Sequence, residues 1–304
     1  MKNKIQNTEN EANSKSPFGD LGVIFDKTKF SSPVGGRGLF FLVLFSVSIF
    51  AEQKMKLVIL HTNDTHSQVE PTDKSTLKTA DMGGYARRMG VIKKIRADEK
   101  NVLLFDAGDF SQGTPYFNFF NGRVEVDAMN RMKYDAVTLG NHEFDNGIDT
   151  LGTILKNASF QVLSSNYQIE KTPLAELVKP YLILKKFGLK IAVITANIEP
   201  KGLIIENNYK GLLYVDALKT ANQLSEFLKR EKHCDLVICL SHLGILPDIE
   251  MARSSTYLDV IIGGHSHSLL ENVSEKNREG KSVIIAQMGK SGLYLGKIEL
   301  ELKR

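Results

Sequence analysis

The stretch KLVILHTNDTH, residues 56–66, contains the pattern from which the fold and the site of this chain can be inferred. Its first part, KLVIL at 56–60, is a short apolar run with β-branched residues, which predicts a buried strand. Its second part is polar and places Asp64 and His66 directly after the predicted strand. Ionisable side chains at the carboxyl end of a strand are typical of the ligand-binding edge of an α/β sheet.

The same succession of apolar run and polar cluster recurs along the chain. Polar clusters follow four further apolar runs, at 101–106, 135–139, 235–240 and 259–263. More strands are predicted at 161–165, 190–195, 282–287 and, from alternating apolar and polar residues, 292–302. Amphipathic stretches at 84–98 and 214–231 predict helices between strands. Strands that alternate with helices predict an α/β fold.

Carboxylate, imidazole and amide side chains gather in these five clusters. Because the carboxyl ends of parallel strands share one edge of a sheet, we expect these side chains to converge in one crevice. Five of the seven histidines of the chain belong to the clusters. The candidate site residues are Asp64, His66, Asp109, Asn141, His142, Asp145, His242, His265 and His267.

The candidate ligands suffice for two metal ions. Carboxylate, imidazole and amide oxygen together suit Zn, Mn or Fe better than Ca or a thiolate-bound centre. With Asp109 as a bridge, one half-site would take Asp64, His66 and His267, and the other Asn141, His242 and His265. Two divalent cations about 3.5–4 Å apart can clamp both oxygens of a phosphoryl displacement and activate a bound water.

Each cluster alone has a plainer interpretation. An Asp-x-His turn is more often a helix cap or a loop than a pair of metal ligands. The isolated His242 would more often be a hydrogen-bonded histidine. Cys234 and Cys239, five residues apart in one apolar run, cannot bridge to each other and are interpreted as small core residues.

The ordered set of motifs is more specific than its members. D-x-H at 64–66, G-D at 108–109, G-N-H at 140–142, His242 and G-H-x-H at 264–267 together resemble the signature of the calcineurin-like metallophosphoesterases. The segments GGYARR, GDFSQGTP and QMGKSGLYLGKIEL are similar to the catalytic domain of the 5'-nucleotidase branch, which includes bacterial UDP-sugar hydrolases and 2',3'-cyclic phosphodiesterases. The resemblance implies a four-layer αββα sandwich of the metallo-dependent phosphatase type.

The resemblance also implies a role for each site residue. Asp64, His66, Asp109 and His267 would hold one divalent metal ion, and Asp109, Asn141, His242 and His265 the other, as Zn, Mn, Fe or Mg. His142, oriented by Asp145, would stabilise the phosphoryl group or protonate the leaving oxygen. The implied reaction is attack of a metal-bound hydroxide on a 5'-nucleotide. Glu143 receives no role.

The first 54 residues are expected to lie outside the catalytic domain, which we place at 55–304. Residues 1–36 have the composition of a disordered leader, and the apolar run 39–51 after Arg37 has the length of a signal h-region rather than of a membrane span. We therefore expect export to the periplasm or the cell surface. Two alternatives stay open: an uncleaved membrane anchor through 39–51, and initiation at Met55 to give a cytoplasmic protein.

Partners and rival functions follow from charge and from the end of the chain. With 39 basic against 35 acidic residues, the composition disfavours binding of a nucleic acid polymer. The 5'-nucleotidase branch carries a C-terminal domain that we expect to be absent here, so either the site is shallow and unselective or a separate chain recognises the base. The rivals are a 2',3'-cyclic-nucleotide phosphodiesterase, a UDP-sugar pyrophosphohydrolase, or a subunit that mainly assembles with that separate chain.

Overall fold

The computed structural model describes residues 54–75 and 78–303. The predicted leader and the apolar run 39–51 lie outside these residues. The described part is a mixed α/β fold with two six-stranded sheets and a two-stranded one.

The first large sheet is parallel apart from one edge strand. Its order is β14 (Gly296–Lys303), β1 (Lys54–Thr62), β2 (Val102–Asp106), β3 (Ala136–Thr138), β4 (Gln161–Leu163) and β6 (Val178–Lys179). Strand β14 runs antiparallel to β1, with Ile59 opposite Ile298. The predicted strand at 292–302 begins only at Gly296, and the turn before it includes Ser291 and Gly292, with φ values of 59° and 57° outside the extended region.

The second large sheet has a parallel centre and two antiparallel edges. Its order is β12 (Leu269–Lys276), β13 (Ser282–Met288), β11 (Val260–Ile262), β10 (Leu236–His242), β8 (Leu189–Asn197) and β7 (Leu182–Lys186). The small sheet pairs β5 (Tyr167–Gln168) with β9 (Leu213–Tyr214).

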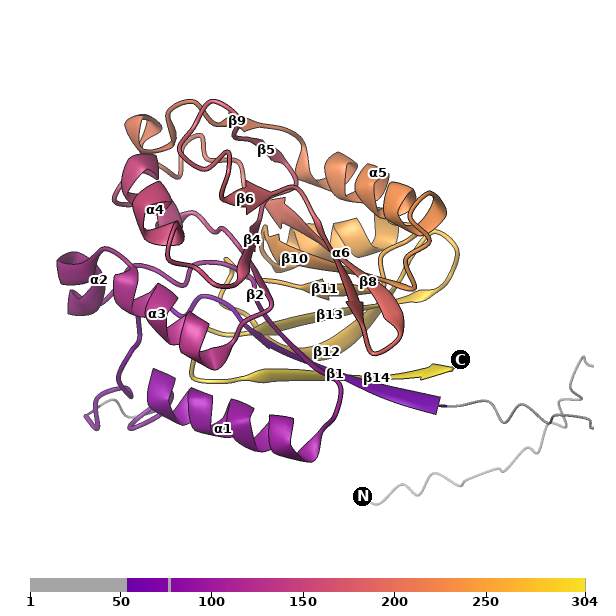
Figure 1. The fold of residues 1–304 in the computed structure, drawn as a ribbon, viewed down its shortest axis with the longest axis horizontal. Coiled ribbons are helices and arrows are strands. Elements are labelled where there is room, and N and C mark those ends of the chain that lie inside the picture. Colours follow the sequence, from indigo (N-terminus) through magenta and orange to yellow (C-terminus); the bar gives the residue numbers. More distant parts are fainter. Residues whose placement is uncertain (1–53, 76–77, 304) are drawn as a thin grey trace, which may run out of the picture. The chain divides into compact units, whose positions relative to one another are not determined.

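Helices cover the outer face of each large sheet (Figure 1). The first sheet is covered by α1 (Tyr85–Asp98), α3 (Arg123–Met132) and α4 (Ile148–Leu155), and the second by α5 (Ala217–Arg230) and α6 (Ile245–Ser254). A third apolar cluster, from strands of both sheets, lies between the sheets. The order helix, sheet, sheet, helix is the four-layer sandwich that the motifs implied, and that prediction is confirmed.

Strand β1 shows why the sequence of a central strand is one continuous apolar run. Val58 and Leu60 pack in the cluster beneath the helices, whereas Leu57 and Ile59 pack against the second sheet. Successive side chains point to opposite faces, and here both faces are buried, so no polar alternation is possible. Cys234 and Cys239 are free and buried in the apolar cluster on the outer face of the second sheet, so they are core residues, as predicted.

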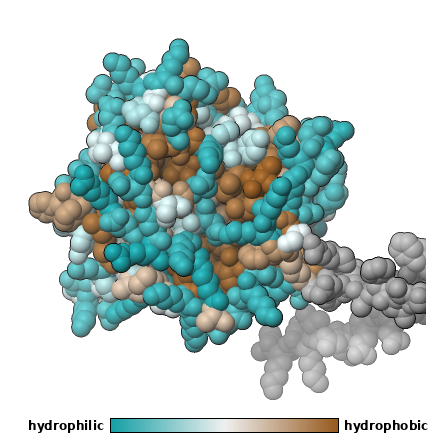
Figure 2. Space-filling model, viewed as in Figure 1, coloured by the Kyte–Doolittle hydropathy of each residue, from teal (hydrophilic) through white to brown (hydrophobic). Residues whose placement is uncertain are grey.

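Four helices and several edge strands were not predicted from the sequence. The short helix α2 (Pro115–Phe120) carries Phe119 and Phe120, 78% and 47% exposed, and Figure 2 shows an apolar protrusion over it at the left edge. Hydrophilic side chains cover most of the neighbouring surface on this side. Among the described residues, no helix is long and apolar enough to cross a bilayer.

Candidate metal centre

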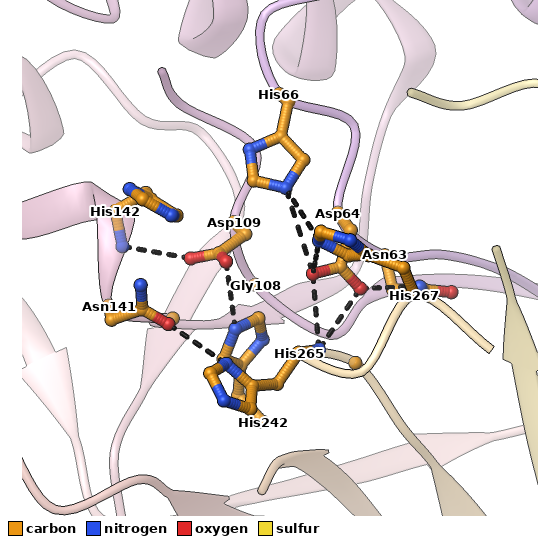
Figure 3. Close-up of polar contacts among 12 residues, drawn as sticks. Asn63, Asp64, His66, Gly108, Asp109, Asn141, His142, His242, His265 and His267 are labelled. Atoms are coloured by element: carbon orange, nitrogen blue, oxygen red, sulfur yellow. Dashed lines mark hydrogen bonds and ion pairs between the residues drawn. The ribbon is translucent and has the colours of Figure 1, made fainter. Parts of the chain in front are cut away.

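The loops that follow β1, β2, β3 and β11, and the last residue of β10, bring the predicted ligands to one place (Figure 3). In the first cluster, ligand atoms of Asp64, His66 and His267 lie within 4.8 Å of one another. In the second cluster, the same holds for Asp109, His242 and His265. The Asn141 Oδ1 atom lies 3.1 Å from His265 Nδ1, so Asn141 joins the second cluster.

Asp109 connects the two clusters. Its carboxylate groups with His242 and His265 in one set of close ligand atoms, and with His66 and His142 in another. Its Oδ2 atom is 3.0 Å from His242 Nε2, and its Oδ1 atom accepts a hydrogen bond of 2.9 Å from the His142 backbone amide. A carboxylate that faces both clusters has the position that a bridging ligand requires.

The ring nitrogens of the site are placed to bind cations. His242 donates from Nδ1 to the carbonyl oxygen of Ala107 at 2.7 Å, which turns the buried Nε2 toward the Asp109 carboxylate, 3.0 Å away. His66 Nε2 and His267 Nε2 face each other at 3.1 Å, where two lone pairs can be satisfied together only by a shared proton or a cation. The hydrogen bond from His242 Nδ1 to a backbone carbonyl is a common way to orient a metal-binding histidine, whose other ring nitrogen then faces the metal.

The pKa values of Asp109 and His242 indicate that these two groups share a proton, which a bound cation would replace. Burial alone lowers the pKa of His242, but the adjacent Asp109 carboxylate raises it to about 10. Burial raises the pKa of Asp109, but the adjacent His242 lowers it by more. The pKa of Asp109 therefore lies well below its usual range. A proton therefore holds these two groups together, and a divalent cation would take its place. Burial lowers the pKa of His66 to about 4, which keeps that ring neutral and able to bind a metal.

His142 and Asp145 form a separate pair beside the clusters. The Nδ1 atom of His142 lies 2.8 Å from Asp145 Oδ2, and this hydrogen bond raises the pKa of His142. The ring centroids of His142 and His66 are 5.3 Å apart. The side chain of His142 is 32% exposed, so it faces the opening of the site rather than the core.

The loop backbones that carry the ligands are in unusual conformations. Five candidate ligands have positive φ, a region that non-glycine residues seldom adopt: Asp64, His66, Asp109, His265 and His267. Bonds between neighbouring loops hold them there: the Asp64 amide donates to Gly108 at 2.9 Å, and the His66 amide to Asp109 at 3.0 Å. Such strain is typical of functional sites.

Close approach explains the glycine before His265. A Cβ atom at Gly264 would lie 2.7 Å from His242 Nδ1 and 2.9 Å from the carbonyl oxygen of Ala107. The backbone at Gly264 therefore packs against both atoms of the hydrogen bond that orients His242. Any larger residue at 264 would displace His242 or the Ala107 carbonyl.

Two residues that support the ligands were missed in the sequence. The Asn63 amide donates to Asp64 Oδ2 at 2.6 Å and to the carbonyl oxygen of Gly289 at 2.9 Å, and its Oδ1 atom accepts from the Met288 amide at 2.7 Å. Asp106 accepts from the Gly108 amide at 2.9 Å. Both residues lie next to the polar clusters in the sequence, and this position could have identified them as supports of the ligands.

Three polar residues at strand ends lie outside the candidate ligand set. Asn166 donates to the Asn197 carbonyl at 2.9 Å, and Asn197 donates to the Leu139 carbonyl at 2.6 Å. The two ring nitrogens of His61 have no hydrogen-bond partner. That ring is buried against Gly296, and burial lowers its pKa to about 4.

Comparison with known proteins places these motifs in a family. The sequence profile of the calcineurin-like phosphoesterases matches residues 57–269. A snake venom 5'-nucleotidase of Naja atra is 34% identical over 267 residues, which are 79% of this chain and 49% of the relative.

Two solved structures extend the comparison to the fold. The 5'-nucleotidase precursor from Thermus thermophilus superposes with a TM-score of 0.76 at 35% identity, over 81% of this chain and 51% of that one. The NAD nucleotidase of Haemophilus influenzae gives a TM-score of 0.76 at 30% identity, over 82% and 48%. The chain thus spans about half the length of these relatives.

Proposed function

The chain belongs to the calcineurin-like phosphoesterase family, and from this membership we propose that it is a metal-dependent phosphoric ester hydrolase, most specifically a 5'-nucleotidase. The observation that carries the proposal is the convergence of two ligand clusters on one carboxylate, Asp109. The similarity to 5'-nucleotidases supports nucleoside monophosphates as substrates.

Seven residues would hold the two divalent metal ions. They divide as Asp64, His66 and His267 on one side and Asn141, His242 and His265 on the other, with Asp109 between them. Bound there, the cations would polarise the phosphoryl oxygens and lower the pKa of a coordinated water. Imidazole, carboxylate and amide ligands do not select among Zn, Mn, Fe and Mg, since occupancy also follows metal availability.

His142 is the proposed general acid. The hydrogen bond to Asp145 raises its pKa, so a larger fraction of its imidazole is protonated near neutral pH. In that form it can donate a proton to the leaving oxygen of the ester. Asp145 holds the ring through Nδ1, which leaves Nε2 as the nitrogen that would donate the proton.

A second substrate class is favoured by one of the comparisons. The similarity to an NAD nucleotidase supports a phosphoric anhydride substrate, in the same class as the UDP-sugar pyrophosphohydrolase alternative. The 2',3'-cyclic-nucleotide phosphodiesterase alternative uses the same metal centre. All three reactions displace an oxygen from phosphorus, so the metal centre itself does not discriminate among them.

We further propose that residues 55–304 act as the catalytic domain and that the chain is exported, as a periplasmic or cell-surface enzyme. Support for export comes from the apolar run 39–51 and from the similarity to a venom enzyme. A separate chain that supplies base recognition is the partner we propose for this domain.

Hydrolysis assays with the purified protein test the proposal. The substrates are 5'-nucleotides, 2',3'-cyclic nucleotides, UDP-glucose, NAD and a chromogenic phosphate ester, each with and without added Zn, Mn or Mg. We expect metal-dependent hydrolysis, measured as product formed, to be fastest for 5'-nucleotides, which release phosphate. Weak and equal activity on all esters would instead support recognition by a second chain, and no metal-dependent activity would refute the proposed function.

A further inference from the structure

Glu143 follows the candidate ligand Asn141 by two positions, on the single turn η1 (His142–Phe144) after β3. Its side chain is buried, with the residue 3% exposed. The Oε2 atom accepts hydrogen bonds from the backbone amides of Asp109 at 2.9 Å and Gly140 at 2.6 Å. The Oε1 atom accepts from the Ser111 amide at 3.0 Å. One carboxylate thus satisfies three buried backbone donors.

The three amides belong to two different ligand-bearing loops. Asp109 and Ser111 lie in the loop after β2, which carries the shared carboxylate. Gly140 lies in the loop after β3 and directly precedes Asn141, a candidate ligand of the second cluster. Glu143 therefore links the backbone of the shared ligand to the backbone of a ligand in one half-site.

The contact between these loops leaves little freedom. A Cβ atom at position 140 would lie 2.1 Å from Asp109 Oδ1 and 2.7 Å from the Asp109 amide nitrogen. The loops meet at glycine on one side, and the carboxylate of Glu143 binds both of them on the other. The two oxygens of the carboxyl group accept from all three donors, which an amide side chain, with one oxygen, could not do without placing its NH2 group against one of them.

We propose that Glu143 is a positioning residue that holds Asp109 and Asn141 at the spacing required for both metal ions to bind. It acts through backbone amides and touches neither metal nor substrate. The inference rests on the proposed function only for the identity of the metal ligands, and its central readout is metal affinity.

The test compares E143Q with the wild-type protein. Glutamine has the same shape but only one acceptor oxygen, so at least one of the three amides would face an NH2 group. We expect E143Q to bind Zn or Mn about 10- to 100-fold more weakly in calorimetric titration, the usual effect of losing a group that orients metal ligands. Activity should be partly restored by excess metal, and E143D, which keeps two oxygens, should retain more affinity than E143Q.

A matched control separates positioning from simple loss of stability. The Asp135 carboxylate also accepts from a backbone amide of β2, that of Leu104 at 2.9 Å, but in the middle of the strand, five positions before Asp109. The Asp135→Asn variant should lose stability and keep wild-type metal affinity. If E143Q loses no more affinity than this control, the inference is wrong.

Hydrogen exchange in the metal-free wild-type protein keeps the inference testable if E143Q does not fold. The amides of Asp109, Ser111 and Gly140 should be protected, and exchange as fast as in an exposed loop would overturn the inference. Failure of the proposed function is separate. A wild-type protein that binds metal but hydrolyses no ester would refute the function and leave the effect of E143Q on metal affinity to decide this inference.

Discussion

Replacement of Asn63 by alanine should weaken both the fold and the metal centre. Asn63 is 1% exposed and makes three hydrogen bonds, to the Asp64 carboxylate and to the backbone of Met288 and Gly289. Alanine removes all three and leaves the Met288 amide and the Gly289 carbonyl buried without these partners.

The magnitude follows from those two backbone groups. A buried polar group that loses its partner costs about 1–3 kcal/mol, so the two together should lower the free energy of unfolding by about 2–6 kcal/mol. This is a large part of the roughly 5–15 kcal/mol that stabilises a typical domain. Asp64 keeps its two contacts of 3.1 Å with the His265 amide, so metal affinity should fall only about 10- to 100-fold.

Urea unfolding of the metal-free protein and calorimetric metal titration measure the two effects. Asn101→Ala is the control, because Asn101 makes a single side-chain bond, of 2.9 Å, to the Lys56 carbonyl in a more exposed position. That variant should lose at most about 1 kcal/mol and no metal affinity. If N63A matches this control in both measurements, the reasoning on buried partners is refuted.

Three further substitutions test other parts of the site and core. Asp109→Asn should remove both metal ions and almost all activity, because its carboxylate serves both clusters; near-normal metal content by mass spectrometry would exclude the bridge. His142→Asn should keep the metals and lower turnover by about 100-fold or more, and a loss of metal would make His142 a ligand. Glu125→Gln should stabilise the protein at neutral pH. Burial raises the pKa of Glu125 above the 4.5 of the unfolded chain, so the wild-type protein loses stability as pH rises through the higher folded value. Its buried oxygens have no hydrogen-bond partner, and equal urea midpoints for both proteins at pH 4.5 and 7.5 would contradict this prediction.

The sequence predicted the central strands because their burial leaves a simple pattern. Strands such as β1 and β10 are covered on both faces, and a run like LVICL can satisfy that environment only with apolar residues. Edge strands have no such signature. Strand β12 is largely exposed along its length and was not predicted from the sequence.

The convergence of the predicted ligands could be inferred without coordinates for a geometric reason. Each ligand follows a strand, and the carboxyl ends of parallel strands meet at one edge, so the order of motifs implies proximity. Their assignment to particular metals and their catalytic roles remain predictions that metal titration and kinetics must test.

The sequence by itself determined which residues end the strands, and from these the family and the candidate ligands. Only the tertiary structure decided what holds those ligands in place. Asn63 bonds to Met288, 225 positions away, and Glu143 bonds to amides 32 and 34 positions before it. Such contacts depend on how two loops pack. The sequence does not show which backbone amides will act as donors to a side chain, since every residue except proline has one.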